Sequence, residues 1–564
     1  MTGHDEARPG SDDRQRFLIS RRALLGGAVG ASMLAVGPGL PGSAGAAPRT
    51  SGRVVTRLGQ DAESSILIGT LGEAKTINPF VTDESEGDWR CKMLFDEFVR
   101  PNPETYAAEP GLAASWEIQD LVFTFTLQPN AKFSDGANVT ADDVKFTIEG
   151  LLRPETASTR AVKFAVIEGA EAFVAGDAGE VSGIEVVDPK TVRITLSKPE
   201  APFLYNLRYV FVAPKAALEG KDLSIASTEE YFRTPVGAGP YVFESWQSGG
   251  DFVATANPHF WEEGKPAIQT LTHRVIADSA ALVNALQAGD ITGSLYPAPT
   301  LAEQLESNPD LQILVPPFNS PNGTLFNCRE APLDDPRVRR AIAMAVNVEE
   351  YVASSLLGLG TAGLGPIAPD SWAYDPNLTP IPFDAEGARA LLAEAGVAEG
   401  TELSMLCNAG NVLREDWLIR CQSDLEAVGI TLNVEFIEWA SLVQRVQETR
   451  DYQMVGADFL GVTAEPSELW DQFHSTSSGN HAGYENPDLD ALLDQARETL
   501  DQEAAKPIYA EIQAILMRDL PFHWAWYRPF IHVMRADVGG FTGSNLEGGV
   551  FRTLPEFVPG APQA

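Results

Sequence analysis

Hydrophobic residues recur along this chain with two different periods, a pattern that predicts both helices and strands. Short apolar runs at residues 66–70 and 121–127 are typical of strands. A helix is predicted to begin after Asp335, where a capping residue is followed by Pro336. Five apolar residues share one face of that helix: Val338, Ala341, Ile342, Ala345 and Val346.

The same kinds of signal predict two further helices. Thr140 is a capping residue, and the acids Asp142 and Asp143 after it complement the positive end of a helix. Another helix is expected from Asp384 to Gly396, because glycine commonly ends helices.

Residues 402–437 predict how helices and strands are joined. A strand at 402–407, a helix at 414–428 and a strand at 431–437 suit a right-handed parallel βαβ unit. With 564 residues the chain is too long for one ordinary hydrophobic core, so we expect two or three domains. The predicted fold class is therefore α/β.

The N-terminal segment has the features of an export signal. Arg21 and Arg22 precede a mildly apolar run at residues 23–36, and small residues follow at 44–46. The run is about 14 residues long, too short for a hydrocarbon core that needs roughly 20. We therefore expect a twin-arginine signal peptide at 1–46 and a periplasmic or secreted protein. No cysteine follows the run, so a lipoprotein anchor is not expected.

The charge balance bears on possible partners. The chain carries 41 Lys and Arg against 78 Asp and Glu, a formal net charge of −37. A nucleic-acid-binding protein needs a basic surface, so nucleic acid is not an expected partner. The apolar content of 44% and charged content of 21% are typical of a folded protein rather than a disordered one.

Four cysteines are present, namely Cys91, Cys328, Cys407 and Cys421. Exported cysteines meet an oxidising compartment in which disulfides persist. Cys407 ends a predicted strand and Cys421 lies in the next helix, so we predict a disulfide that contributes about 3 kcal/mol. Free buried thiols are the alternative, and the pairing of Cys91 and Cys328 stays open. No Cys-x-x-Cys spacing occurs, and we predict no metal site.

The stretches 234–246 and 257–261 carry the most specific signal. They read Thr-Pro-Val-Gly-Ala-Gly-Pro-Tyr-Val-Phe-Glu-Ser-Trp and Asn-Pro-His-Phe-Trp. Gly237 and Gly239 permit the backbone angles of a turn, and a half-buried strand is predicted after them. The string resembles a signature of family 5 extracellular solute-binding proteins, the dipeptide-, oligopeptide- and nickel-binding receptors of ABC importers.

Further segments resemble landmarks of the same family, in the same order along the chain. Each is weak by itself, and together they are specific. They lie at residues 111–116, 133–144, 327–341, 383–396, 484–490 and 520–521.

The resemblance implies a periplasmic-binding-protein-like type II fold, a bilobal cleft receptor with three domains. Its expected division is a flexible segment at 47–63, a discontinuous domain I at 64–100, 226–315 and 520–564, domain II at 101–225 and domain III at 316–519. It also implies capture of a peptide-like or other polar solute by closure of the cleft, and delivery to ABC permease subunits in the membrane. We expect a monomer that is not an enzyme and uses no cofactor.

The sequence leaves two other functions open. A secreted glycoside hydrolase needs only two suitably spaced carboxylates among the 78 acids. A cleft-type sensor would deliver its ligand to a signalling partner instead of a permease. A formal dinucleotide fingerprint at Gly358, Gly360 and Gly363 follows a helix instead of a strand, and we interpret it as a connection.

The family pattern also suggests which residues line the cleft. The candidates are loop residues, strand ends and aromatic stacking surfaces; ordinary packing or a solvated loop is the alternative for each. They are Thr82, Asp83, Glu84, Asn322, Gly323, Trp439, Asp458, Phe459, Trp526 and Tyr527.

One departure from the pattern concerns the ligand. Peptide-binding members carry an aspartate for the peptide's α-ammonium three residues before an acidic residue and proline. Glu465 and Pro466 resemble that pair, which places Val462 at the anchor position. Asp458 replaces the anchor only if the loop is rearranged. Because burying an ammonium without a carboxylate is costly, a saccharide or opine-like solute gains weight, and a peptide remains possible.

Overall fold

The computed structural model describes residues 65–102, 107–224, 230–294, 304–315, 317–369, 371–458, 465–529, 531–540 and 557–559. The predicted signal peptide at 1–46 and flexible segment at 47–63 lie outside these ranges. So do the candidate Phe459 and Val462. None of the described helices is long and apolar enough to cross a membrane.

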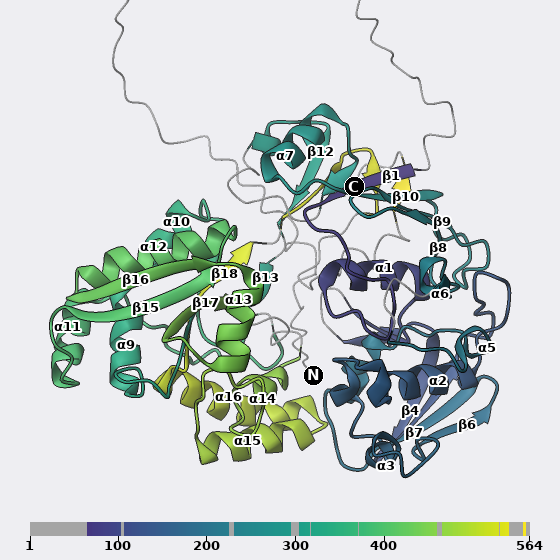
Figure 1. The fold of residues 1–564 in the computed structure, drawn as a ribbon, viewed down its shortest axis with the longest axis horizontal. Helices are drawn as coiled ribbons and strands as arrows, with labels where there is room; N and C mark the ends of the chain where they lie inside the picture. The colour runs from purple at the N-terminus through teal and green to yellow at the C-terminus, as the bar shows by residue number, and fades with distance from the viewer. Residues whose placement is uncertain are drawn as a thin grey trace, which may run out of the picture. The chain divides into compact units, whose positions relative to one another are not determined.

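A seven-stranded sheet collects strands from distant parts of the chain (Figure 1). Its order is β12-β19-β11-β1-β10-β9-β8, with β1 pairing in parallel with both β10 and β11. Helices α1 (Ser85–Phe95), α6 (Glu230–Arg233) and α7 (Ser279–Ala288) belong to the same region. The strands are β1 (Ser65–Thr70), β8 (Tyr241–Trp246), β9 (Phe252–Ala256), β10 (Thr270–Val275), β11 (Gly293–Ser294), β12 (Leu311–Leu314) and β19 (His532–Arg535).

The glycines before β8 are explained by close packing. Neither Gly237 nor Gly239 has a positive φ, which corrects the expectation of unusual backbone angles. A Cβ at either position would instead clash with the backbone carbonyls of Met93 or Leu94 at the end of α1. The Gly239 N–H donates to the Leu94 carbonyl at 2.9 Å, so the turn lies directly on the helix.

A four-stranded antiparallel sheet, in the order β4-β5-β7-β6, follows α1 in the chain. Helix α2 (Ala141–Leu152) packs on it and begins at the predicted cap, where the Asp143 carboxylate accepts the Thr140 N–H at 2.8 Å. Both sheets contribute to one hydrophobic core, and we call them together the first lobe. The strands are β4 (Ala113–Gln119), β5 (Val122–Leu127), β6 (Ile184–Asp188) and β7 (Thr191–Thr195).

Short elements complete the first lobe. They are β2 (Val99–Pro101), β3 (Ala108–Pro110), α3 (Ala170–Val174), α4 (Phe203–Asn206), α5 (Lys215–Leu218), β20 (Val538–Gly539), β21 (Val558–Pro559) and the 3-10 turns Pro154–Thr156, Ala161–Lys163 and Leu207–Tyr209.

A six-stranded sheet in the order β14-β18-β13-β17-β15-β16 forms the second lobe, with separate hydrophobic clusters on its two faces. The strands are β13 (Pro317–Phe326), β14 (Thr361–Ala362), β15 (Thr401–Asn408), β16 (Ile430–Ile437), β17 (Met454–Asp458) and β18 (Phe522–Pro529). The helices are α9 (Pro336–Ala345), α10 (Val348–Ser354), α11 (Ala385–Glu394), α12 (Val412–Glu426), α13 (Trp439–Val443), α14 (Glu468–Phe473), α15 (Pro487–Glu498) and α16 (Gln502–Asp519), with a π-helical turn at Gln444–Thr449.

The predicted parallel pair of strands around a helix is confirmed. Strands β15 and β16 pair in parallel from Thr401 opposite Ile430 to Asn408 opposite Ile437, and α12 connects them. The predicted caps Asp335 and Asp384 begin α9 and α11. Residues 355–360 connect α10 to the edge strand β14 and Gly363 follows that strand directly, so the connection expected from sequence includes a short strand.

The predicted disulfide between Cys407 and Cys421 is not formed, because the four cysteines are free thiols. Cys407 lies on β15, whereas the Cys421 side chain on α12 hydrogen-bonds to Thr324 on β13. Strand β17 lies between β15 and β13, so the Cys421 side chain contacts a different strand from the one that carries Cys407. Leu418 of α12 packs over Gly456 on β17, the strand between the two.

Candidate functional site

Three of the predicted residues lie in one row of the six-stranded sheet. Asn322 on β13 is opposite Asp458 on β17 and opposite Trp526 on β18. Tyr527 on β18 is opposite Pro321 on β13, and Gly323 on β13 is opposite Ala457 on β17. Because neighbouring strands lie about 4.8 Å apart, this row brings together residues more than 100 positions apart in sequence.

Two aromatic candidates in this row do not present stacking surfaces. Trp526 is 1% exposed, and its ring lies 5.2 Å from that of Tyr351. Tyr527 is 5% exposed and donates its hydroxyl to the Gly365 carbonyl at 2.8 Å. Strand β18 lies inside the sheet with core on both faces, so its side chains pack there. Trp439, at the start of α13, is instead 55% exposed.

The candidates before α1 differ in what they do. The Glu84 carboxylate caps the helix by accepting the N–H groups of Glu86 and Gly87, each at 2.8 Å. Burial raises the pKa of Glu84, and these backbone hydrogen bonds oppose the rise. Thr82 is buried and donates to Asp88 at 3.3 Å, whereas Asp83 is exposed. Of these three, Asp83 offers the most accessible side chain.

Asp458 is engaged by a cation of the protein. Arg414 on α12 forms an ion pair with Asp458 and also donates to Asn408 at 2.8 Å. The two side chains of the pair are only 12% and 18% exposed. A ligand ammonium would have to compete with Arg414 for this carboxylate.

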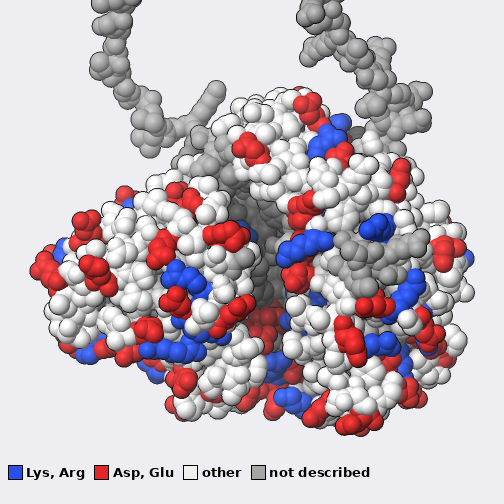
Figure 2. Space-filling model, in the orientation of Figure 1, with Lys and Arg blue, Asp and Glu red and all other residues white. Residues whose placement is uncertain are grey.

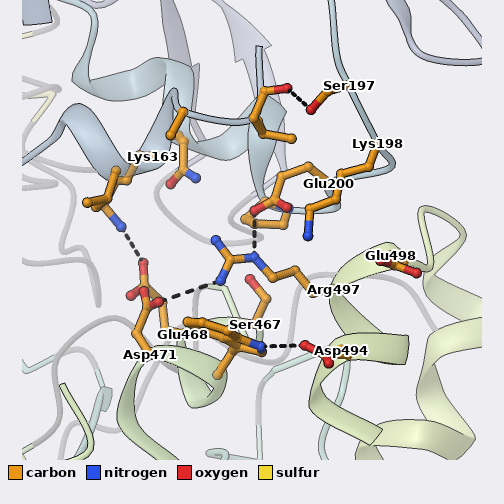
Figure 3. Close-up of a pocket in the computed structure, with 16 residues that line it drawn as sticks. Lys163, Ser197, Lys198, Glu200, Ser467, Glu468, Asp471, Asp494, Arg497 and Glu498 are labelled. Atoms are coloured by element: carbon orange, nitrogen blue, oxygen red, sulfur yellow. Dashed lines mark hydrogen bonds and ion pairs between the residues drawn. The ribbon is translucent and has the colours of Figure 1, made fainter. Parts of the chain in front are cut away.

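A polar cavity of about 390 Å³ lies where the two lobes meet (Figure 3). The first lobe contributes Lys163, Glu200 and Asn206, and the second lobe contributes Glu468 and Arg497. None of these residues was among the sequence-based candidates. They belong to no sequence motif. The cavity forms only when distant segments come together, because Lys163 and Glu468 are 305 residues apart and Glu200 and Arg497 are 297 residues apart.

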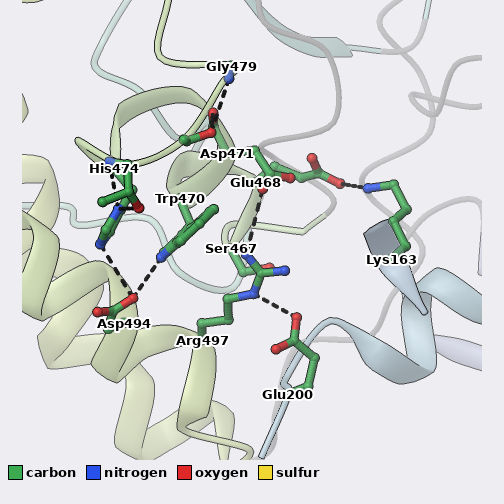
Figure 4. Close-up of polar contacts among 12 residues, drawn as sticks. Lys163, Glu200, Ser467, Glu468, Trp470, Asp471, His474, Gly479, Asp494 and Arg497 are labelled. Atoms are coloured by element: carbon green, nitrogen blue, oxygen red, sulfur yellow. Dashed lines mark hydrogen bonds and ion pairs between the residues drawn. The ribbon is translucent and has the colours of Figure 1, made fainter. Parts of the chain in front are cut away.

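Two ion pairs cross the cavity between the lobes (Figure 4). Lys163 Nζ lies 3.1 Å from Glu468 Oε1, and Arg497 Nε lies 2.6 Å from Glu200 Oε1. The Ala201 N–H also donates to the Arg497 carbonyl at 2.8 Å. The lobes are therefore joined by charge pairs and by the backbone.

Trp470 supports the second-lobe side of this contact. The Trp470 ring on α14 stacks on the His474 ring, with 4.5 Å between the ring centroids. The guanidinium of Arg497, on α15, lies 4.7 Å from the centroid of the Trp470 ring. Its indole N–H donates to Asp494 at 2.7 Å, as drawn in Figure 4. Trp470 thus fixes the side chain that pairs with Glu200.

Glu465 begins the described part of the segment that follows the predicted anchor loop. Burial raises the pKa of this carboxyl to about 7, although the Ser467 N–H donates to it at 3.1 Å. The pKa of Glu465 is raised further by the charge of Glu468 and lowered by Lys163 and by the side chain of Ser467. On the face drawn in Figure 2, acidic and basic residues are intermixed, without one extended basic surface.

Comparisons with known proteins agree with one another. The family model described as bacterial extracellular solute-binding proteins, family 5 Middle, matches residues 107–481. Di/tripeptide-binding protein 2 of Pseudomonas aeruginosa is 30% identical over 477 residues, which cover 81% of this chain and 88% of that protein.

Solved structures show the same fold. The oligopeptide-binding protein AppA from Bacillus subtilis, in complex with a nonapeptide, matches with a TM-score of 0.75 at 24% identity. AgaA from A. tumefaciens R10, in complex with agropinic acid, matches with a TM-score of 0.73 at 25% identity. Each match covers 88% of this chain and 99% of the other chain.

The family match covers more than half of the chain, and this family consists of binding proteins. The glycoside hydrolase alternative is therefore excluded, and the mixed α/β, multi-domain cleft fold is that of the oligopeptide-binding proteins. The chain belongs to the bacterial extracellular solute-binding proteins, family 5, and is the solute-binding component of an ABC importer.

Proposed function

We propose that the chain captures a small polar solute between its two lobes and delivers it to membrane permease subunits as a monomer. The cavity of about 390 Å³ that both lobes line is the observation that carries this proposal. A solute that contacts both lobes binds the closed arrangement more tightly than the open one, and thereby shifts the population toward closure.

The proposed solute is a small peptide-like or opine-like compound. A di/tripeptide-binding protein among the relatives and the agropinic acid complex of AgaA support this class. The ion pair of Asp458 with Arg414 and the presence of Val462 at the anchor position disfavour a peptide held by its ammonium in this loop. Asp83 and the exposed Trp439 are the sequence-based candidates with accessible side chains; neither lines this cavity, so we propose them only as contacts of a part of the solute that extends beyond it.

The solute can be identified directly. Freshly purified protein is denatured, and the released small molecules are identified by mass spectrometry. A thermal-shift series then tests dipeptides, opines and disaccharides, because a ligand at about 100 times its Kd stabilises the folded state by roughly 2.7 kcal/mol. Stabilisation by disaccharides alone would contradict the peptide-like or opine-like class.

Export by the twin-arginine route is part of the proposal. Replacing Arg21 and Arg22 together with lysine is expected to leave the precursor in the cytoplasm, because the pair is the recognised feature of such signals. Cell fractionation measures this. Capture of permease subunits by the exported, ligand-loaded protein supports import, and capture of a sensor kinase alone would favour the sensor alternative.

We also propose the three-domain division expected from sequence, with one change. Strand β18 (Phe522–Pro529) pairs with β13 and β14 of the six-stranded sheet, so we assign it to domain III instead of domain I. Limited proteolysis followed by mass determination of the stable fragments tests this boundary.

A further inference from the structure

The turn Ala161–Lys163 of the first lobe joins two contacts that lead in opposite directions. Arg160, the residue before this turn, forms an ion pair with Asp88 on α1. Lys163, the last residue of the turn, lies 3.1 Å from Glu468 of the second lobe. The Lys163 N–H donates to the Arg160 carbonyl at 3.0 Å, so one hydrogen-bonded turn carries both side chains.

The ring of Tyr209 contacts both cations. Arg160 Cζ lies 4.8 Å from the centroid of this ring, and Lys163 Nζ lies 5.6 Å from it. Arg160 Cζ also lies 5.3 Å from the ring centroid of Phe211, and Arg160 is only 5% exposed. Contacts between a cation and an aromatic face are stabilising, and more so away from water. The Arg160 guanidinium is therefore fixed in position, and a shift of either cation disturbs the ring that the other one contacts.

The Asp88 carboxylate connects Arg160 to the loop before α1. The same Asp88 oxygen that pairs with Arg160 accepts the Thr82 hydroxyl at 3.3 Å. The loop also packs closely on the first turn of the helix, because a Cβ at Gly87 would lie 2.4 Å from Thr82 Oγ1. Residues 82–84, which we call the α1 loop, are therefore held to the start of α1 by packing and by a hydrogen bond.

These contacts form a continuous series between two places that a solute would influence. The α1 loop includes Asp83, an exposed residue that we propose as a contact of the solute outside the cavity. The pair of Lys163 with Glu468 lies in the cavity and requires the lobes to be together (Figure 4). Coupling between two sites needs an element with two arrangements that both sites bias, and closure of the lobes is such an element.

We propose that Arg160 positions Lys163 for its contact with the second lobe, and thereby couples the α1 loop to closure of the lobes. A solute that orders the α1 loop also fixes the pair of Asp88 with Arg160, which holds Lys163 where it reaches the second lobe. A solute that contacts only the second lobe lacks this contribution, so the receptor closes preferentially around solutes that reach the α1 loop. This preference rests on the proposed function, whereas the coupling concerns the protein's own residues alone.

Hydrogen exchange in the full-length mature protein, without added solute, tests the coupling. Glu468→Gln removes the charged partner of Lys163, and we expect amides in residues 82–90 to exchange at least about threefold faster. In an Asp88→Asn background the same substitution should cause no further change, because the series of contacts is already broken. Coupling is reciprocal, so Asp88→Asn by itself should also speed exchange in α14.

The other interlobe pair separates this coupling from opening of the lobes. Arg497→Gln breaks the pair with Glu200 and leaves Lys163 in place, so it shows what opening alone does to the α1 loop. Its effect on residues 82–90 should be smaller than that of Glu468→Gln, and it should persist in the Asp88→Asn background.

Two further variants keep the result interpretable. Thr82→Val removes the hydroxyl that bonds to Asp88 but leaves the ion pair with Arg160, and it serves as the background if Asp88→Asn does not fold. Glu185→Gln breaks an exposed pair with Arg193 in the same lobe, and should change exchange neither in the α1 loop nor in α14.

Two outcomes would overturn the inference. The first is that Glu468→Gln and Arg497→Gln have equal effects on the α1 loop. The second is that the effect of Glu468→Gln persists in full in the Asp88→Asn background. Because no solute is used, a protein that binds none of the proposed solutes can still show the coupling, and a protein that binds them can lack it.

Discussion

Arg497 on α15 donates to Glu200 of the first lobe across 2.6 Å, and thereby joins two segments that are 297 residues apart. The Glu200 side chain is only 4% exposed, and that of Arg497 is 21% exposed. Arg497 is also held by the Trp470 ring and lies 3.6 Å from Asp471. The pair is therefore shielded and oriented, unlike most surface ion pairs.

Breaking this pair is expected to favour the open arrangement of the lobes. Glu200→Gln or Arg497→Gln leaves a shielded charge without its partner, and such a loss costs up to about 3–5 kcal/mol in a fully buried pair. We expect ligand affinity to fall roughly tenfold or more, because the closed arrangement loses stability relative to the open one. Small-angle scattering measures the open fraction, and calorimetry measures the affinity.

Two controls separate closure from general damage. Glu503→Gln breaks the exposed pair between Glu503 and Lys506 on α16 and should leave closure unchanged. The exchanged pair Glu200→Arg with Arg497→Glu should recover part of the affinity. An unchanged open fraction in both single variants would show that the contact has no role in closure.

Glu465 makes stability depend on pH in a predictable direction. Burial raises the pKa of its carboxyl in the folded protein to about 7, above its ordinary value of 4.5. The folded state then binds more protons than the unfolded state between these two values, so stability falls as pH rises from about 4.5 to 7. The Gln variant lacks this titration.

Glu465→Gln is therefore expected to be more stable than the wild type at pH 8, by up to about 3 kcal/mol, and similar to it at pH 4.5. Urea unfolding at both pH values measures the difference, and the amide still accepts a hydrogen bond from Ser467. A variant that is less stable than the wild type at pH 8 would show that the charged carboxylate is favoured in the folded protein.

Local patterns predicted much of the second lobe, whereas the cavity could not be predicted. Strands β15 and β16 and helix α12 follow from periodicity within residues 401–437, because their neighbours in space are neighbours in sequence. Glu200 and Arg497 are ordinary charged residues until folding brings them together. Trp526 was misjudged because a strand buried on both faces has no polar alternation to mark its inward side chains.

A substitution at Gly456 can show how tightly α12 packs on the six-stranded sheet. A Cβ at this position would lie 2.6 Å from Leu418 Cδ1, so Gly456→Ala is expected to destabilise the protein by about 1–3 kcal/mol through overpacking. Adding Leu418→Ala should make the Gly456→Ala substitution nearly neutral. Gly179→Ala is the control, because a Cβ there meets nothing within 4 Å. Urea unfolding gives the coupling between the two sites.

The separation of Cys407 from Cys421 gives the last prediction. Protein exported into an oxidising compartment and purified without reductant should release four titratable thiols in denaturant, because the four cysteines are free. The folded protein should react slowly at pH 8, since burial raises the pKa of the Cys328 and Cys407 thiols to about 11. Ellman's reagent measures the number of thiols in denaturant and the rate at which the folded protein reacts. Fewer than four thiols in denaturant, together with a peptide linking Cys407 to Cys421, would restore the disulfide predicted from sequence.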